Sequence, residues 1–140
     1  MSYLNGITLK RPFDETVAMV RDALAAQGFG VLTEIDVRAT MKAKLDAEID
    51  NYLILGACNP PLAYRAIQAE PSLGVLLPCN VVVRSDGPES TVVEAVDPAT
   101  LVDLTDNNDL LAVTNEVSAR LTAVLDSLDR PEISAEAVTA

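Results

Sequence analysis

The chain has 140 residues, of which 49% are hydrophobic and 4% aromatic, and its net charge is −11. This length and composition predict one globular domain with an aliphatic core, and they exclude a wholly disordered chain. A strong negative charge repels phosphate backbones, so we expect no nucleic-acid partner. The sequence also contains no histidine, which excludes Ser-His-Asp and Cys-His catalysis and every histidine metal site.

The N-terminal segment lacks the basic start and long apolar core of a secretory signal. The longest apolar run, residues 73–83, is about half of what a membrane span needs. We therefore expect a cytoplasmic protein with reduced thiols and no membrane association. Residues 1–130 should form the single domain, and residues 131–140 a mobile tail.

The first half of the chain alternates strands with helices. Asp14 is suited to capping the first helix and Gly28 to ending it, while Asp36 can cap the second. The strand between them alternates apolar and polar positions. The predicted elements are a strand at 3–9, a helix at 14–27, a strand at 29–35 and a helix at 37–45.

The middle of the chain contains two apolar runs that each contain a Cys-Asn pair. Asn59 and Pro60 mark a helix start between them, because Asn is a good N-cap and Pro suits the first helical position. Pro78 interrupts the second run and implies a bulge, a bend or an edge position. The predicted elements are a strand at 52–57, a helix at 60–69, a strand at 73–84 and a strand at 91–96 that forms a hairpin with it.

The last part of the chain should be a loop at 99–108 followed by a long helix at 109–129. Apolar residues recur every three or four positions along that helix: Leu110, Val113, Val117, Leu121, Val124 and Leu128. Such a wide stripe must be buried, and one face of the sheet is its natural partner. The element order therefore predicts a two-layer α/β sandwich, with parallel strand pairing expected across the helix at 60–69.

Both cysteines of the chain, Cys58 and Cys79, lie at strand ends that meet if the two strands are neighbours. Three interpretations stay open: small buried hydrophobic side chains, reactive or redox-sensing thiols, and a disulfide or shared metal. Cys58 directly precedes a helix N-terminus, where open N–H groups stabilise a thiolate. Two thiolates alone do not complete a zinc site, so we predict no metal.

The asparagines that follow the cysteines are candidates for binding a ligand. Asn59 and Asn80 can either satisfy the backbone or place two amides in one pocket. Gly56 allows close approach of a ligand to the backbone before the helix start, which is a possible anion site. Glu34 and Asp36 should share one face of their strand, either as a carboxylate pair or as a solvated residue and a helix cap.

Three motifs resemble a known family. They are G-F-x-V-x-x-E-I-D at residues 28–36, L-G-A-C-N-P at 55–60 and L-P-C-N-V at 77–81. Together they are similar to the bacterial and archaeal domain of unknown function 302 family, over residues 3–129. The resemblance implies a β-α-β4-α fold related to the TATA-binding protein, in which the long C-terminal helix packs on a curved, mainly antiparallel sheet and two short helices are insertions. It also implies a homodimer, and it brings no established activity or cofactor.

These observations favour a homodimeric small-ligand-binding or sensing domain. Its pocket is expected near the two Cys-Asn pairs, at Cys58, Asn59, Cys79, Asn80, Glu34 and Gly56. The alternative is a thiol-dependent enzyme or redox protein that uses Cys58 or Cys79. The sequence assigns no cofactor and no ligand identity.

Overall fold

The structure is a computed structural model that describes residues 2–129, so the tail predicted at 131–140 lies outside the described residues. Five strands form one sheet in the order β1-β5-β4-β3-β2, and every neighbouring pair is antiparallel. The strands are β1 (Leu4–Leu9), β2 (Gly30–Asp36), β3 (Tyr52–Cys58), β4 (Cys79–Ser85) and β5 (Thr91–Val96).

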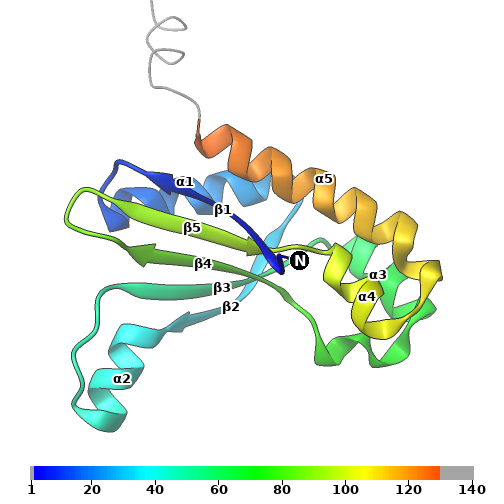
Figure 1. Cartoon of the computed structure of the whole chain (residues 1–140), viewed down its shortest axis with the longest axis horizontal. Coiled ribbons are helices and arrows are strands. Elements are labelled where there is room, and N and C mark those ends of the chain that lie inside the picture. Colours follow the sequence, from blue (N-terminus) through cyan, green and yellow to red (C-terminus); the bar gives the residue numbers. More distant parts are fainter. Residues whose placement is uncertain (1, 130–140) are drawn as a thin grey trace, which may run out of the picture.

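Two long helices, α1 (Phe13–Ala26) and α5 (Leu111–Leu128), lie on the same side of this sheet (Figure 1). The predicted apolar stripe of the last helix is buried at every position, from Leu110 to Leu128. It packs toward a sheet face whose central residues, among them Leu55, Val81 and Val93, are fully buried. This confirms the two-layer arrangement with the long C-terminal helix on an antiparallel sheet.

Shorter helices occupy the two ends of the strands. The helix α2 (Val37–Leu45) joins β2 to β3 at one end, and α3 (Pro60–Ala69) joins β3 to β4 at the opposite end. The helix α4 (Ala99–Thr105) follows β5 and lies near α3 (Figure 1). Two 3₁₀ turns complete the chain, η1 (Pro71–Val75) before β4 and η2 (Asn108–Leu110) before α5.

The parallel pairing that the element order alone suggests across α3 is wrong, and the mainly antiparallel sheet implied by the family resemblance is confirmed. β3 and β4 pair antiparallel, with Ala57 opposite Cys79 and Leu53 opposite Val83. A parallel crossover would have to carry the chain back along the whole strand. Here α3 and η1 instead turn the chain at one end of the sheet, so β4 starts where β3 stops.

The strand predicted at 73–84 is also too long. Residues 71–75 form η1, and β4 begins only at Cys79. Pro78 has no N–H for the ladder, which limits the strand on this side. Leu73 is nevertheless 1% exposed, so the apolar character of this run reflects burial under the helices and not strand structure.

The loop predicted at 99–108 contains the helix α4. Asp97 stabilises its first turn, because the Asp97 carboxylate accepts a hydrogen bond from the Ala99 N–H at 3.0 Å. Leu101 supplies its buried side chain. The helix predicted from residue 109 begins at Leu111, because residues 108–110 form the tighter turn η2.

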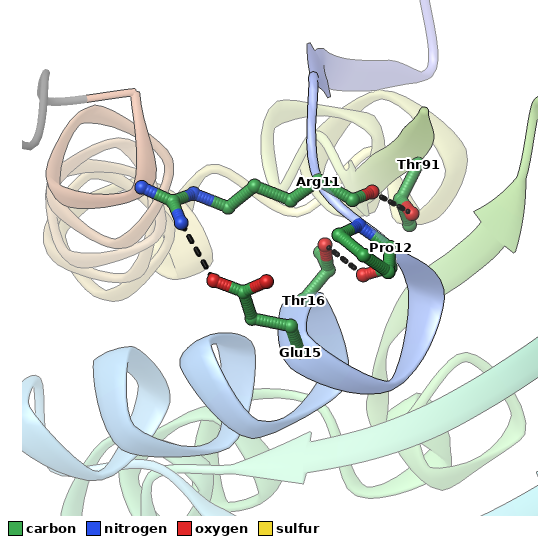
Figure 2. Close-up of polar contacts among 5 residues, drawn as sticks. All are labelled: Arg11, Pro12, Glu15, Thr16 and Thr91. Atoms are coloured by element: carbon green, nitrogen blue, oxygen red, sulfur yellow. Dashed lines mark hydrogen bonds and ion pairs between the residues drawn. The ribbon is translucent and has the colours of Figure 1, made fainter. Parts of the chain in front are cut away.

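Two buried hydroxyl groups bind the connection between β1 and α1, one from β5 and one from α1 itself (Figure 2). Thr91 at the start of β5 donates its Oγ1 hydrogen to the Arg11 carbonyl at 2.8 Å. Thr16 donates to the Pro12 carbonyl at 2.9 Å, and Glu15 forms an ion pair with Arg11 at 2.6 Å. Both threonine residues are fully buried, so this junction fixes where α1 starts over the sheet.

Candidate functional site

A cavity of about 300 Å³ lies at the end of the sheet where β3 and β4 meet α3, η1 and α5. Hydrocarbon side chains form most of its wall, and none of the described residues that line it is charged. It opens to the surface, because Leu32 and Ile67 line it while they are 66% and 44% exposed. Its deeper apolar lining includes Phe29, Leu62, Ala66, Leu73, Leu77 and Val117.

Three of the predicted site residues line this cavity: Cys58, Asn59 and Cys79. Cys58 is the last residue of β3, Asn59 follows it, and Cys79 is the first residue of β4. Cys79 stands opposite Ala57 in the ladder, one residue from Cys58. Antiparallel pairing therefore brings together two thiols that are 21 positions apart in the sequence.

Asn59 caps α3, as predicted. Its Oδ1 accepts a hydrogen bond from the Leu62 N–H at 3.4 Å, and its carbonyl accepts one from the Ala63 N–H at 2.9 Å. The first two helical residues are Pro60 and Pro61, which have no N–H. Each of the first four residues of α3 therefore either lacks an N–H or already donates it to Asn59. No open N–H therefore remains at this helix N-terminus to bind the expected anion or to stabilise a Cys58 thiolate.

The two thiols of the cavity differ in their surroundings. Cys79 is buried and Cys58 is half-buried, and both are free. Burial, and in smaller measure the nearby Cys58, raises the pKa of the Cys79 thiol to about 11. Cys79 therefore stays protonated at neutral pH and is a poor nucleophile.

The other predicted residues do not line this cavity. Gly56 faces the opposite side of the sheet, where an added Cβ would lie 2.1 Å from Thr33 Oγ1 and 2.7 Å from Pro78 Cγ. Asn80 is the exposed partner of Gly56 in the ladder. The glycine is needed for strand packing, and the structure gives neither residue a place in the cavity wall.

Glu34 lies farther along β2. It forms an ion pair with Arg21 of α1 at 2.7 Å. Asp36 caps α2 by accepting from the Ala39 N–H at 2.9 Å. The two carboxylates do line one small hollow of about 210 Å³, as the strand alternation predicted, but it is separate from the cavity beside the cysteines.

Sequence reasoning missed the apolar wall of the cavity, because its residues read as ordinary core. Leu32 differs from the other lining residues, because it lies at an irregularity in its strand. The register of β2 shifts between Val31 and Thr33, which leaves Leu32 unpaired at a bulge. Bulges redirect side chains near functional sites, and this one places Leu32 at the mouth of the cavity.

Within the described residues, 2–129, no three His, Cys, Asp or Glu side chains are grouped so that they could hold a metal ion. None of the helices in this part of the chain has the length and apolar character needed to cross a membrane.

The sequence profile described as "Domain of unknown function DUF302" matches residues 6–128. The chain belongs to the DUF302 family. A crystal structure of an uncharacterized conserved DUF302 protein from Bacillus stearothermophilus superimposes with a TM-score of 0.83 and 26% sequence identity, over 90% of this chain and 98% of that chain. No protein of curated function matches the chain.

The three segments that carry the family resemblance all contribute to the cavity of this DUF302 domain. Residues 28–36 supply Phe29 and Leu32 to its wall. Residues 55–60 supply Ala57, Cys58 and Asn59, and residues 77–81 supply Leu77, Pro78 and Cys79. The resemblance and the cavity therefore coincide in space.

Proposed function

We propose that this protein is a cytoplasmic, homodimeric domain that binds or senses a small molecule in the cavity beside Cys58, Asn59 and Cys79. The observation that carries the proposal is the cavity itself, at the lower end of the usual size range for ligand sites. It joins an apolar wall to a few polar groups, which is the usual composition of such sites. The relation to the TATA-binding protein fold that the family resemblance implies would carry no function, and the charge of −11 opposes DNA binding.

A ligand-observed NMR screen of a small-metabolite library tests the binding proposal. Ala63 of α3 lines the cavity, so Ala63→Leu should fill part of it while keeping good helix propensity. Ala119→Leu makes the same change at an exposed position of α5. We expect at least one compound to bind the wild type and Ala119→Leu but not Ala63→Leu. A library without any such compound would contradict the proposal.

The dimer is supported by the exposed segment from β2 through α2. The nine-residue helix α2 has no buried residue, and a helix of this length gains little stability from its own backbone in water. Ile35 and Leu45 are 48% and 70% exposed there. A second copy of the chain would cover these side chains.

Analytical ultracentrifugation tests this interface. We expect a dimer for the wild type and a monomer for Leu45→Glu, because a carboxylate would be buried unpaired in the interface. Leu104→Glu is the matched control, since Leu104 is 69% exposed on α4. A monomeric wild type would refute the dimer, and a dimeric Leu45→Glu variant would refute this interface.

The alternative function is a thiol-dependent enzyme or redox protein. The raised pKa of Cys79 leaves Cys58 as the better nucleophile. Rates of iodoacetamide alkylation at each thiol, followed by mass spectrometry from pH 6 to 9, test this alternative. A Cys58 that reacts faster than a model thiol at pH 7 would support it, whereas ordinary or slow reaction at both positions would remove it.

A further inference from the structure

The polar groups of the cavity differ in whether their hydrogen bonds are already made. Thr114 donates its hydroxyl hydrogen to the Leu111 carbonyl at 3.1 Å. The Oδ1 of Asn59 is taken by the Leu62 N–H. The Nδ2 of Asn59, in contrast, donates to no residue among those described, although Asn59 is only 8% exposed.

This donor still has accessible surface. Every enclosed side-chain nitrogen or oxygen in the described part of the chain has a hydrogen-bond partner, so Nδ2 is not sealed in. Nδ2 lies beside Gly28, since a Cβ at that glycine would lie 3.1 Å from Nδ2 and 3.6 Å from Nη1 of Arg120. Asn59 itself lines the cavity, so a ligand there that carries an acceptor could occupy the open donor of Asn59.

The charge of the ligand is limited by the same surroundings. Among residues 2–129, no Lys, Arg, Asp or Glu lines the cavity, and the N-terminus of α3 has no open N–H to offer an anion. A charged group placed inside would lose its hydration without finding a counter-charge among the lining residues. The thiol of Cys79 is buried and adds only a weak donor.

We propose, building on the binding function above, that the ligand is an uncharged molecule with a hydrocarbon body and one hydrogen-bond acceptor that Asn59 Nδ2 engages. The hydrocarbon body fills the space between α3, η1 and α5. The acceptor is a carbonyl, ether or hydroxyl oxygen at the Asn59 end of the cavity.

Three probes with the same chain length test the charge requirement at pH 7: 2-octanone, octanoate and octylammonium. Binding is measured by NMR titration, with Ala63→Leu to show that the shifts report the cavity. We expect 2-octanone to bind at least tenfold more tightly than either ion. Octanoate or octylammonium binding as tightly as 2-octanone, or no binding of 2-octanone at millimolar concentration, would overturn the inference. Binding of an ion in the cavity would leave the binding function itself intact.

Asn59→Ser tests the acceptor requirement. The hydroxyl oxygen can still cap α3, because Ser and Asn are equally good N-caps, but the shorter, uncharged side chain places no N–H at the position of Nδ2. We expect the affinity for 2-octanone to fall about tenfold with the melting temperature preserved. Asn115→Ser makes the same change at an exposed position of α5 and should bind normally. Equal affinity of Asn59→Ser and the wild type would show that Asn59 does not engage the acceptor.

Discussion

Asn59 shows how one residue can serve both the fold and a site. Its oxygen caps α3 while the same residue forms part of the cavity wall. The two prolines that follow it remove the donors that would otherwise attract an anion. The polar groups that a ligand can engage are therefore those whose hydrogen bonds the fold does not already use.

Thr91 offers a test of a buried hydroxyl group. Thr91→Val keeps the shape of the side chain but removes the donor to the Arg11 carbonyl, so we expect the free energy of unfolding to fall by about 1–2 kcal/mol. Urea unfolding measures it. Thr122→Val, at an exposed position of α5, is the control and should stay within about 0.5 kcal/mol of the wild type. Equal stability of both variants would mean that the junction in Figure 2 contributes nothing net.

The Cys79 thiol makes a prediction about pH. Its pKa rises from the ordinary 9.0 to about 11 in the folded chain, so between these values the unfolded chain releases a proton that the folded chain keeps. Its contribution to stability is therefore complete below about pH 9 and is lost as pH rises toward 11. As the pH rises from 8 to 10, the free energy of unfolding should fall by about 1 kcal/mol less for Cys79→Ala than for the wild type. Urea unfolding at each pH measures this difference. Parallel pH profiles for the two proteins would contradict this.

Among the elements, β3 is the strand that packs on both faces and also ends at the cavity. Its buried residues face α1 and α5, while Gly56 lets Thr33 of β2 and the ring of Pro78 approach on the other side. The same strand ends in Cys58, where the cavity begins. Packing on both sides of one strand therefore positions the candidate site.

Gly56→Ala should be strongly destabilising for this reason. The new methyl group would overlap Thr33 Oγ1 and crowd Pro78, so we expect a loss of about 2–3 kcal/mol in thermal or urea unfolding. Thr33→Ala in the same chain should restore part of it. The control is Gly74→Ala, where an added Cβ meets nothing within 4 Å. A Gly56→Ala variant as stable as Gly74→Ala would show that the strands move apart at little cost.

For the whole molecule, the dominant feature is the excess of acidic residues, 21 against 10 basic ones. Some basic residues form ion pairs, such as Arg84 with Glu94 at 3.0 Å and Lys42 with Glu48 at 3.0 Å. The pairs on the surface contribute little each. The remaining negative charges repel one another, which opposes the compact state.

The salt dependence of stability distinguishes the attraction within surface ion pairs from the repulsion among the acidic residues. Raising sodium chloride from about 0.01 M to about 0.2 M shortens the screening distance from about 30 Å to below 10 Å. If repulsion dominates, as we expect, the free energy of unfolding rises by an amount on the order of 1 kcal/mol. A fall in stability with salt, measured by urea unfolding, would instead mean that the surface ion pairs outweigh the repulsion.

Local patterns in the sequence determined most of the elements of this protein. The caps at Asp36 and Asn59, the turn at Gly28 and the apolar stripe of α5 follow from interactions between residues near one another in the chain. For the same reason, the sequence also located the cavity residues Cys58, Asn59 and Cys79 at element boundaries. Long apolar runs were ambiguous, so residues 73–78 were misassigned to a strand.

Only the tertiary structure decided what lies beside what. Antiparallel pairing of β3 with β4 placed the two cysteines together. Asn80 lies outside the cavity wall because successive strand residues face opposite sides of the sheet, and Glu34 lines a separate hollow from its position on β2. The wall of the cavity comes from segments spread over most of the chain, and a lining leucine has the same sequence pattern as a packed one. Whether apolar side chains meet or leave a space depends on the distance between elements, and no local pattern encodes that distance.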